Sequence, residues 1–161
     1  MLNTATSDLR MSESWPARTA RTVSAVYASL NQLAPAAFLL LRCWVAWQFF
    51  KSGLTKLPIE NAIILFKNEY AVPLLPPVLA AYLATAVELG CSALLMVGLA
   101  GRISALGLFI LNIIAVISYA EASLQDHLPW GLILLLFVLH GPDKLSLDYL
   151  IGKALNDRRH G

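Results

Sequence analysis

The fold of this 161-residue chain is decided by residues 77–119, which read PVLAAYLATAVELGCSALLMVGLAGRISALGLFILNIIAVISY. The charged residues in this stretch are Glu88 and Arg102. A membrane-spanning helix needs about 20 mostly apolar residues. The stretch therefore predicts two spans, Pro77–Ala100 and Gly101–Tyr119.

Two further apolar runs complete the pattern. Pro35–Gly53 predicts a span, and so does a run at about His127–His140, which is short enough that its helix is expected to begin upstream near Ala122. The chain is 58% hydrophobic and 14% charged, whereas about 25% of the residues in a soluble domain are charged. We therefore predict an all-α protein, an integral membrane four-helix bundle that lies in the lipid bilayer. The net charge of +2 gives no support for nucleic-acid binding.

The predicted domain boundaries follow from these spans. Residues 1–33 are polar and are expected to form a disordered or surface-lying cytoplasmic tail, in which Val23–Leu33 has a weak pattern for an interfacial helix. Residues 34–150 form the transmembrane domain, and residues 151–161 form a cytoplasmic tail.

Orientation is predicted from the Lys and Arg residues outside the membrane, which favour the cytoplasmic side. One side has eight: Arg10, Arg18, Arg21, Arg102, Lys144, Lys153, Arg158 and Arg159. The other side has three: Lys51, Lys56 and Lys67. Both termini are therefore expected in the cytoplasm. On the opposite side, Glu60–Tyr70 predicts a short amphipathic helix, which Pro73, Pro76 and Pro77 end before the second span begins.

Three polar residues inside the predicted spans form a candidate intramembrane site: Arg42, Glu88 and Asn112. A charge in a membrane interior costs roughly 3 kcal/mol or more unless it finds a partner. Two pairings are open: Arg42 with Glu88, or Arg42 with Asp148 and Glu88 with Asn112. Either arrangement fits an ion pair that fixes helix packing, or a ligand or proton site.

Helical spacing places Arg42, Phe49, Gly53 and Lys56 in one stripe of the first span. Lys56 nevertheless lies near the predicted outer surface, where we expect a solvated charge.

Several chemistries lack the residues they need. Cys43 and Cys91 lie in separate spans without a C-x-x-C pair. His127 and His140 lie on the same span, whereas a bis-histidine haem needs facing helices. Asp126–His127 is an adjacent polar pair, expected at the membrane interface. We therefore predict no catalytic residue, no metal site and no covalently bound cofactor in the chain itself.

Three motifs resemble the DoxX family of membrane proteins over about Ala34–Leu150. The first is Arg42 followed by an aromatic-rich run to Ser52-Gly53-Leu54-Thr55-Lys56-Leu57, and the second is Glu88 fourteen residues before Arg102 with Gly98 between them. The third is Gly141-Pro142-Asp143-Lys144-Leu145-Ser146-Leu147-Asp148. The resemblance marks these as family-motif residues: Gly53, Lys56, Arg102, Gly141, Pro142, Ser146 and Asp148.

The third motif departs from the family's usual Gly-Pro-Gly-Arg-x-Ser-Leu-Asp, because Asp143 replaces a glycine and Lys144 replaces an arginine. This departure puts a glycine-specific turn in doubt. Ser146 remains, and it is expected to cap a short helix from Leu147 to Leu155 with Asp148 in its first turn.

The resemblance implies a bacterial inner-membrane protein. It favours an accessory protein, a membrane anchor or partner subunit of a redox or peptide-modifying system, because one subgroup is often encoded beside enzymes that modify metal-binding peptides. The first alternative is a quinone-binding component of an oxidoreductase, and the second is a small transporter. An enzyme or redox partner is expected, and a homo-oligomer is left open.

A cavity around Arg42 and Glu88 would favour the quinone-binding hypothesis over the anchor hypothesis, since an anchor needs no cavity. A quinone is expected against the aromatic residues Trp44, Trp47, Phe49 and Phe50, near Arg42 or Glu88, and Arg42→Met is expected to remove its binding.

Overall fold

The computed structural model describes the backbone of residues 3–70, 72, 74–118, 124–141 and 143–160, and the side chains of these residues from 19 to 159. The described residues form helices and no strand, which confirms the all-α prediction. The chain divides into two compact units, residues 1–37 and 38–161.

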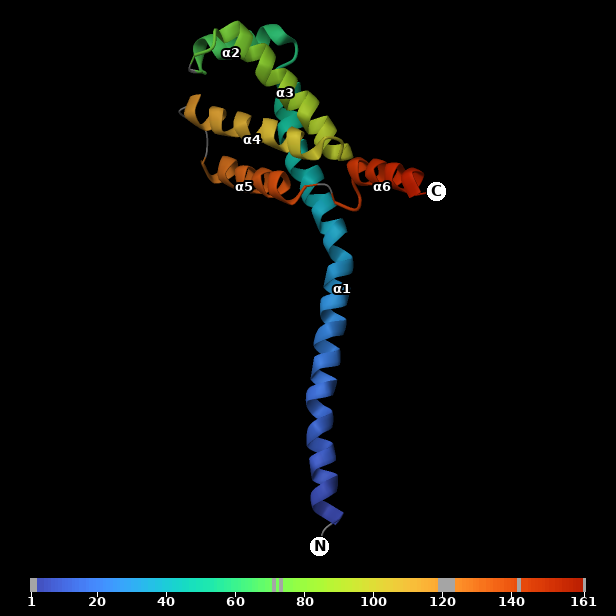
Figure 1. Ribbon diagram of the computed structural model, residues 1–161. Helices are drawn as coiled ribbons and strands as arrows, with labels where there is room; N and C mark the ends of the chain where they lie inside the picture. The colour runs from blue at the N-terminus through green and yellow to red at the C-terminus, as the bar shows by residue number, and fades with distance from the viewer. Residues whose placement is uncertain (1–2, 71, 73, 119–123, 142, 161) are drawn as a thin grey trace. The chain divides into compact units, whose positions relative to one another are not determined.

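The helices occur in the predicted order (Figure 1). They are α1 (Asn3–Thr55), α2 (Ile59–Asn68), α3 (Pro77–Val97), α4 (Gly101–Ser118), α5 (Leu124–His140) and α6 (Leu147–His160). Within the described residues, three helices are long and apolar enough to cross a membrane: Thr19–Thr55 of α1, α3 and α4. Helix α5 is apolar but has 17 residues, and its predicted start near Ala122 lies outside the described residues, as does Tyr119.

The N-terminal unit is helical wherever it is described. Helix α1 begins at Asn3 and continues through Pro35, so the described residues of this unit are helical rather than disordered, and the helix is longer than the expected Val23–Leu33. Its exposed apolar side chains follow helical spacing and lie within one sector of the helix. They are Val23, Val26, Tyr27, Leu30 and Leu33. The cytoplasmic placement of this tail stays a prediction.

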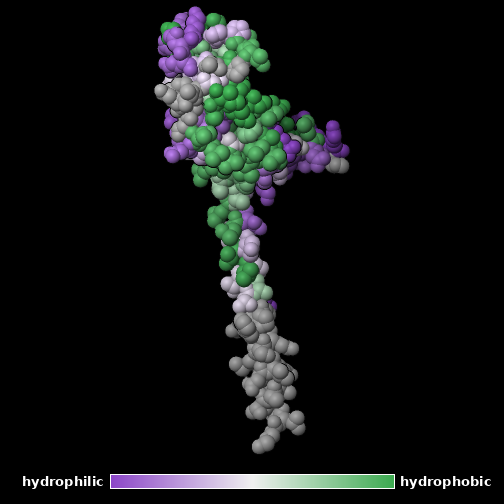
Figure 2. Space-filling model, turned by 90° about the vertical axis from the view of Figure 1, so that its left-hand side faces the viewer, coloured by the Kyte–Doolittle hydropathy of each residue, from purple (hydrophilic) through white to green (hydrophobic). Residues whose placement is uncertain are grey.

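The second unit has its core where α1, α3, α4 and α5 meet. The fully buried residues there include Val45 and Ala46 of α1, Leu95 of α3, Leu108 of α4 and Leu134 of α5. Figure 2 shows hydrophobic residues gathered over the middle of this unit and hydrophilic residues toward the end where α2 lies. Such a surface suits a bundle that contacts lipid around its middle.

The predicted amphipathic helix between the first two spans is α2. It buries Ala62 and Phe66 against Ala80, Ala81 and Ala84 of α3. Small side chains allow this close packing. Pro76 is the N-cap of α3 and Pro77 its first residue, as predicted. Helix α2 therefore covers one end of the bundle.

Candidate functional site

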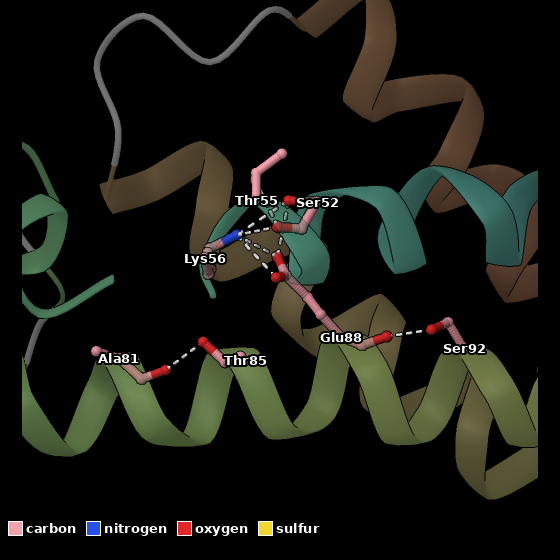
Figure 3. A network of polar contacts seen from close by, with 7 residues as sticks. All are labelled: Ser52, Thr55, Lys56, Ala81, Thr85, Glu88 and Ser92. Atoms are coloured by element: carbon pink, nitrogen blue, oxygen red, sulfur yellow. Dashed lines mark hydrogen bonds and ion pairs between the residues drawn. The ribbon is translucent and has the colours of Figure 1, made fainter. Parts of the chain in front are cut away.

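The site is centred on an ion pair between α1 and α3. Lys56 Nζ donates to both carboxylate oxygens of Glu88, at 2.8 and 2.7 Å. Ser52 Oγ donates to Glu88 Oε1 at 3.1 Å and accepts from Lys56 Nζ at 2.9 Å. The Lys56 and Glu88 side chains are 8% and 9% exposed. Figure 3 shows Ser52 of α1 and Lys56, which directly follows α1, meeting Glu88 of α3.

Small residues let the two helices approach at this point. A Cβ added at Gly53 would lie 2.8 Å from Leu89 Cδ2 and 3.1 Å from Glu88 Cβ, so only glycine fits here without a shift. On α3, the hydroxyl of Thr85 donates to the carbonyl of Ala81, and that of Ser92 donates to the carbonyl of Glu88 (Figure 3). Both hydroxyls are thereby satisfied inside the bundle.

The structure corrects the expected pairing of Glu88 and the expected exposure of Lys56. Glu88 contacts neither Arg42 nor Asn112, and Lys56 is buried rather than solvated. The reason is depth: Lys56 follows Arg42 by 14 residues, which at 1.5 Å per residue is about 21 Å along α1. The predicted stripe is confirmed, because Arg42, Phe49, Gly53 and Lys56 are all buried. One stripe thus carries two cations at two depths.

Arg42 forms the second ion pair, with the closing motif instead of Glu88 or Asp148. Its Nη1 donates to Asp143 Oδ2 at 3.0 Å, and its Nη2 donates to the carbonyl of Leu145 at 3.1 Å. Asp143 Oδ1 accepts from the backbone N–H of Leu145 at 2.8 Å, and the Asp143 carbonyl accepts from Ser146 Oγ at 2.6 Å. The residue that departs from the family's usual motif therefore supplies the countercharge for Arg42.

Asp148 has a different task from the expected pairing with Arg42. Its carboxylate accepts from the backbone N–H groups of Ala100 and Gly101, at 2.9 and 2.8 Å, at the start of α4. Helix starts leave such N–H groups without internal partners, so Asp148 caps α4 from the first turn of α6. Ser146 caps α6 as predicted, since its Oγ accepts from the Tyr149 N–H at 3.2 Å.

Two motif glycines are required by space and by backbone conformation. Gly98 ends α3 at φ 72°, and an added Cβ would lie 2.7 Å from Arg42 Nη1. Gly141 has φ 82°, and an added Cβ would lie 2.6 Å from Arg102 Nε. The Arg102 guanidinium thus packs over Gly141 and donates to the Leu139 carbonyl at 3.5 Å. Pro142 lies outside the described residues.

Asn112 pairs with His127 and not with Glu88. The Asn112 amide nitrogen donates to the His127 carbonyl at 2.9 Å, and its Oδ1 lies 2.8 Å from His127 Nδ1. Gly131, one turn further along α5, makes room: its added Cβ would lie 3.1 Å from Asn112 Nδ2. The contact joins α4 to α5, and the position of Asp126 and His127 at the membrane interface stays a prediction.

A cavity of about 440 Å³ opens beside the Lys56–Glu88 pair. We call it the Glu88 cavity. Its polar lining residues are Gln48, Ser52, Lys56, Tyr70, Glu88, Ser118 and His127. Its apolar lining includes Phe49, Phe66, Leu83, Leu111 and Trp130. Small-molecule sites have volumes of about 300–1,000 Å³ and combine apolar walls with a few polar groups, so the cavity has the character of a ligand site.

The expected aromatic wall is only partly correct. Phe49 lines the cavity, but Trp44 and Trp47 point elsewhere and are about half exposed, and Phe50 is not among the lining residues. Trp130 packs edge-on against Phe49 with ring centroids 5.7 Å apart. Arg42 also lies away from the Glu88 cavity, so it contributes nothing to a ligand bound there.

Sequence reasoning missed His127 and Trp130 as parts of the site. One signal could have found His127. Asn112 is a buried polar residue, and such a residue needs a hydrogen-bond partner at its own depth, which the apolar run of α5 could supply. Among the described residues, no group of three or more His, Cys, Asp or Glu side chains is placed to hold a metal ion.

A four-helix, apolar bundle with buried ion pairs and an internal cavity defines a polytopic membrane protein. The model of the DoxX family matches residues 37–120. An uncharacterized protein of Haemophilus influenzae is 35% identical over 126 residues, which cover 72% of this chain and 83% of that protein. The chain therefore belongs to the DoxX family. No solved structure matches it.

Proposed function

We propose that this DoxX-family membrane protein binds an apolar, quinone-like carrier in the Glu88 cavity and serves as the carrier-binding component of a membrane redox system. The observation that carries the proposal is the cavity itself, about 440 Å³ beside a buried ion pair. The cavity is partly open to the surface of the bundle, and a purely structural anchor needs no such pocket.

The lining fits a carrier with a flat ring better than it fits a strongly hydrated solute. Phe49, Phe66, Tyr70 and Trp130 supply aromatic faces, and such faces stack on rings with a gain of about 0.5–1.5 kcal/mol beyond their area. The charges of Lys56 and Glu88 cancel each other. The cavity therefore presents polar atoms without net charge, which suits a neutral carrier.

No catalytic residue is assigned to the chain under this proposal. The electrons of the carrier would pass to or from a redox enzyme as partner, with the bilayer as the route by which the carrier enters. The bacterial inner membrane, with both termini in the cytoplasm, is the location we propose.

The test is to purify the protein in mild detergent, extract it with organic solvent and measure lipid-soluble carriers per protein by mass spectrometry. Ala84→Phe places a ring in the cavity, because Ala84 is buried and lines it. Ala86→Phe is the matched control, because Ala86 is exposed on the same helix and does not line the cavity. Ala115→Phe, from the α4 side of the cavity, repeats the test should Ala84→Phe fold poorly.

We expect a near-stoichiometric carrier in the wild type and in Ala86→Phe, and its loss from the two cavity variants. Absence of any lipid-soluble carrier from a wild-type protein that co-purifies with an enzyme would favour the partner-subunit hypothesis instead.

A further inference from the structure

We infer that His127 is a hydrogen-bond acceptor in the wall of the Glu88 cavity, and that it makes the cavity prefer a ligand that donates a hydroxyl, such as a phenol or the reduced, quinol form of a carrier. This inference rests on the proposed function and names the chemical form that is bound. It follows from the contact between Asn112 and His127 together with the position of His127 in the cavity wall.

The contact fixes which nitrogen of His127 carries the proton. The His127 carbonyl can only accept, so the amide nitrogen of Asn112 must face it, at 2.9 Å. The oxygen of the same amide then faces Nδ1 at 2.8 Å, and two acceptors do not form a hydrogen bond. Nδ1 must therefore carry the hydrogen. In the neutral ring this leaves the lone pair on Nε2, which can only accept.

Asn112 holds this arrangement firmly. Its side chain is buried, with 4% exposure, and its amide binds both the ring and the backbone of His127. If the amide were flipped, its nitrogen would face the Nδ1–H group of His127 and its oxygen would face the His127 carbonyl oxygen, so both hydrogen bonds would be lost. Partner groups of this kind fix the tautomer and orientation of a histidine. Asn112 is thus a positioning residue for His127.

The Lys56–Glu88 pair in the cavity wall has no proton left for a ligand, whereas the buried hydroxyl of Ser118, which also lines the cavity and has no partner among the described residues, can donate or accept. The Lys56 ammonium donates to both oxygens of Glu88 and to Ser52 Oγ, which uses its three protons. A ligand carbonyl could not accept from Lys56 without breaking one of these bonds. His127 Nε2 offers an acceptor that the Asn112 contact does not use.

The surroundings of His127 suit a ring that carries a hydroxyl group. Trp130 packs edge-on against His127 with ring centroids 5.0 Å apart, and both residues line the cavity. A ring lying against Trp130 would bring a hydroxyl substituent toward the imidazole. A quinone carbonyl in the same place would set two acceptors against each other, which costs binding free energy.

The first experiment changes the ligand and leaves the protein intact. Displacement of radiolabelled decylubiquinol from the wild-type protein in nanodiscs is measured anaerobically near pH 8, where a histidine side chain is ordinarily neutral. The competitors are decylubiquinol, its dimethyl ether and decylubiquinone. We expect the dimethyl ether and the quinone to bind at least about tenfold more weakly than the quinol, since neither can donate.

The second experiment changes the protein. His127→Asn keeps an amide near the position of Nδ1, for the contact with Asn112, and removes Nε2. We expect it to bind the quinol and its dimethyl ether equally. His140→Asn is the control, because His140 stacks on Phe38 and does not line the cavity; it should keep the wild-type preference.

Equal wild-type affinity for the quinol and its dimethyl ether would overturn the inference, and so would a preference that survives in His127→Asn. In either case binding itself would remain, and the proposed function with it. A wild-type protein that binds none of the three compounds would instead overturn the proposed function and the inference that rests on it.

Discussion

The ammonium nitrogen of Lys56 lies 2.8 and 2.7 Å from the two carboxylate oxygens of Glu88, although 32 residues separate the two positions in the chain. The pair is almost completely buried. A buried ion pair contributes little net stability compared with an apolar pair, but breaking it leaves an uncompensated charge. Its position on the wall of a cavity suits it to a role in binding.

Removing the carboxylate should therefore destabilise the bundle by an amount that depends on what replaces it. We expect Glu88→Ala to cost about 3–5 kcal/mol, because it leaves the Lys56 ammonium unpaired. Glu88→Gln should cost less, because its amide oxygen still accepts from Lys56. Thermal melts in detergent measure both. Small and equal shifts would mean that Glu88 faces water or lipid.

A double substitution separates charge from packing. The Lys56→Met change alone should be strongly destabilising, whereas Lys56→Met with Glu88→Leu should recover most of the loss, because an apolar pair needs no partner. The control is Lys51→Met, on the same helix but exposed, which should leave the melting temperature nearly unchanged. Additive losses in the double variant would contradict a direct pair.

The Arg42–Asp143 pair should govern stability and not ligand binding. We expect Arg42→Met to lower the melting temperature through the unpaired Asp143, while the folded fraction keeps its carrier, because Arg42 does not line the Glu88 cavity. This replaces the expectation from sequence that Arg42→Met removes binding. Carrier content per folded protein is the measurement, and Lys144→Met, an exposed neighbour of Asp143, is the control. Loss of the carrier from stable Arg42→Met protein would place Arg42 in the site.

Gly90 within α3 and Gly98, the residue that caps its end, should respond differently to alanine. Gly98→Ala should destabilise by at least about 1–3 kcal/mol, because φ is 72° and the new Cβ would meet Arg42 and Ser146. An added Cβ at Gly90 meets nothing within 4 Å, so Gly90→Ala should be neutral or stabilising by up to about 1 kcal/mol. The two melts, run side by side, test whether the closing motif packs on the end of α3. Equal shifts would argue against that packing.

The topology prediction concerns the whole chain. The count of eight against three Lys and Arg residues predicts both termini in the cytoplasm and four spans. Fused reporters should place Gly161 inside and Asn61 outside. A reporter that places Gly161 outside would contradict the orientation and the number of spans together.

The sequence by itself determined the helices that follow the N-terminal tail, and the stripe that carries the cations. Long apolar runs and prolines at helix starts are local signals, and they placed α2, α3 and α4 within a few residues. The repeat of buried positions from Arg42 to Lys56 follows from helical periodicity alone. The cap at Ser146 was also predictable, because a cap acts within a few residues of the chain.

Only the tertiary structure decided which charges meet. Pairing depends on the relative depth and rotation of helices that are far apart in the chain, and one helical turn moves a side chain by about 5.4 Å. Asp143 could be recognised as a departure from a motif but not as the partner of Arg42, and no local pattern identified His127 as the partner of Asn112. The Glu88 cavity likewise arises from residues of α1, α2, α3, α4 and α5, because empty space is a property of how helices pack and not of any one segment.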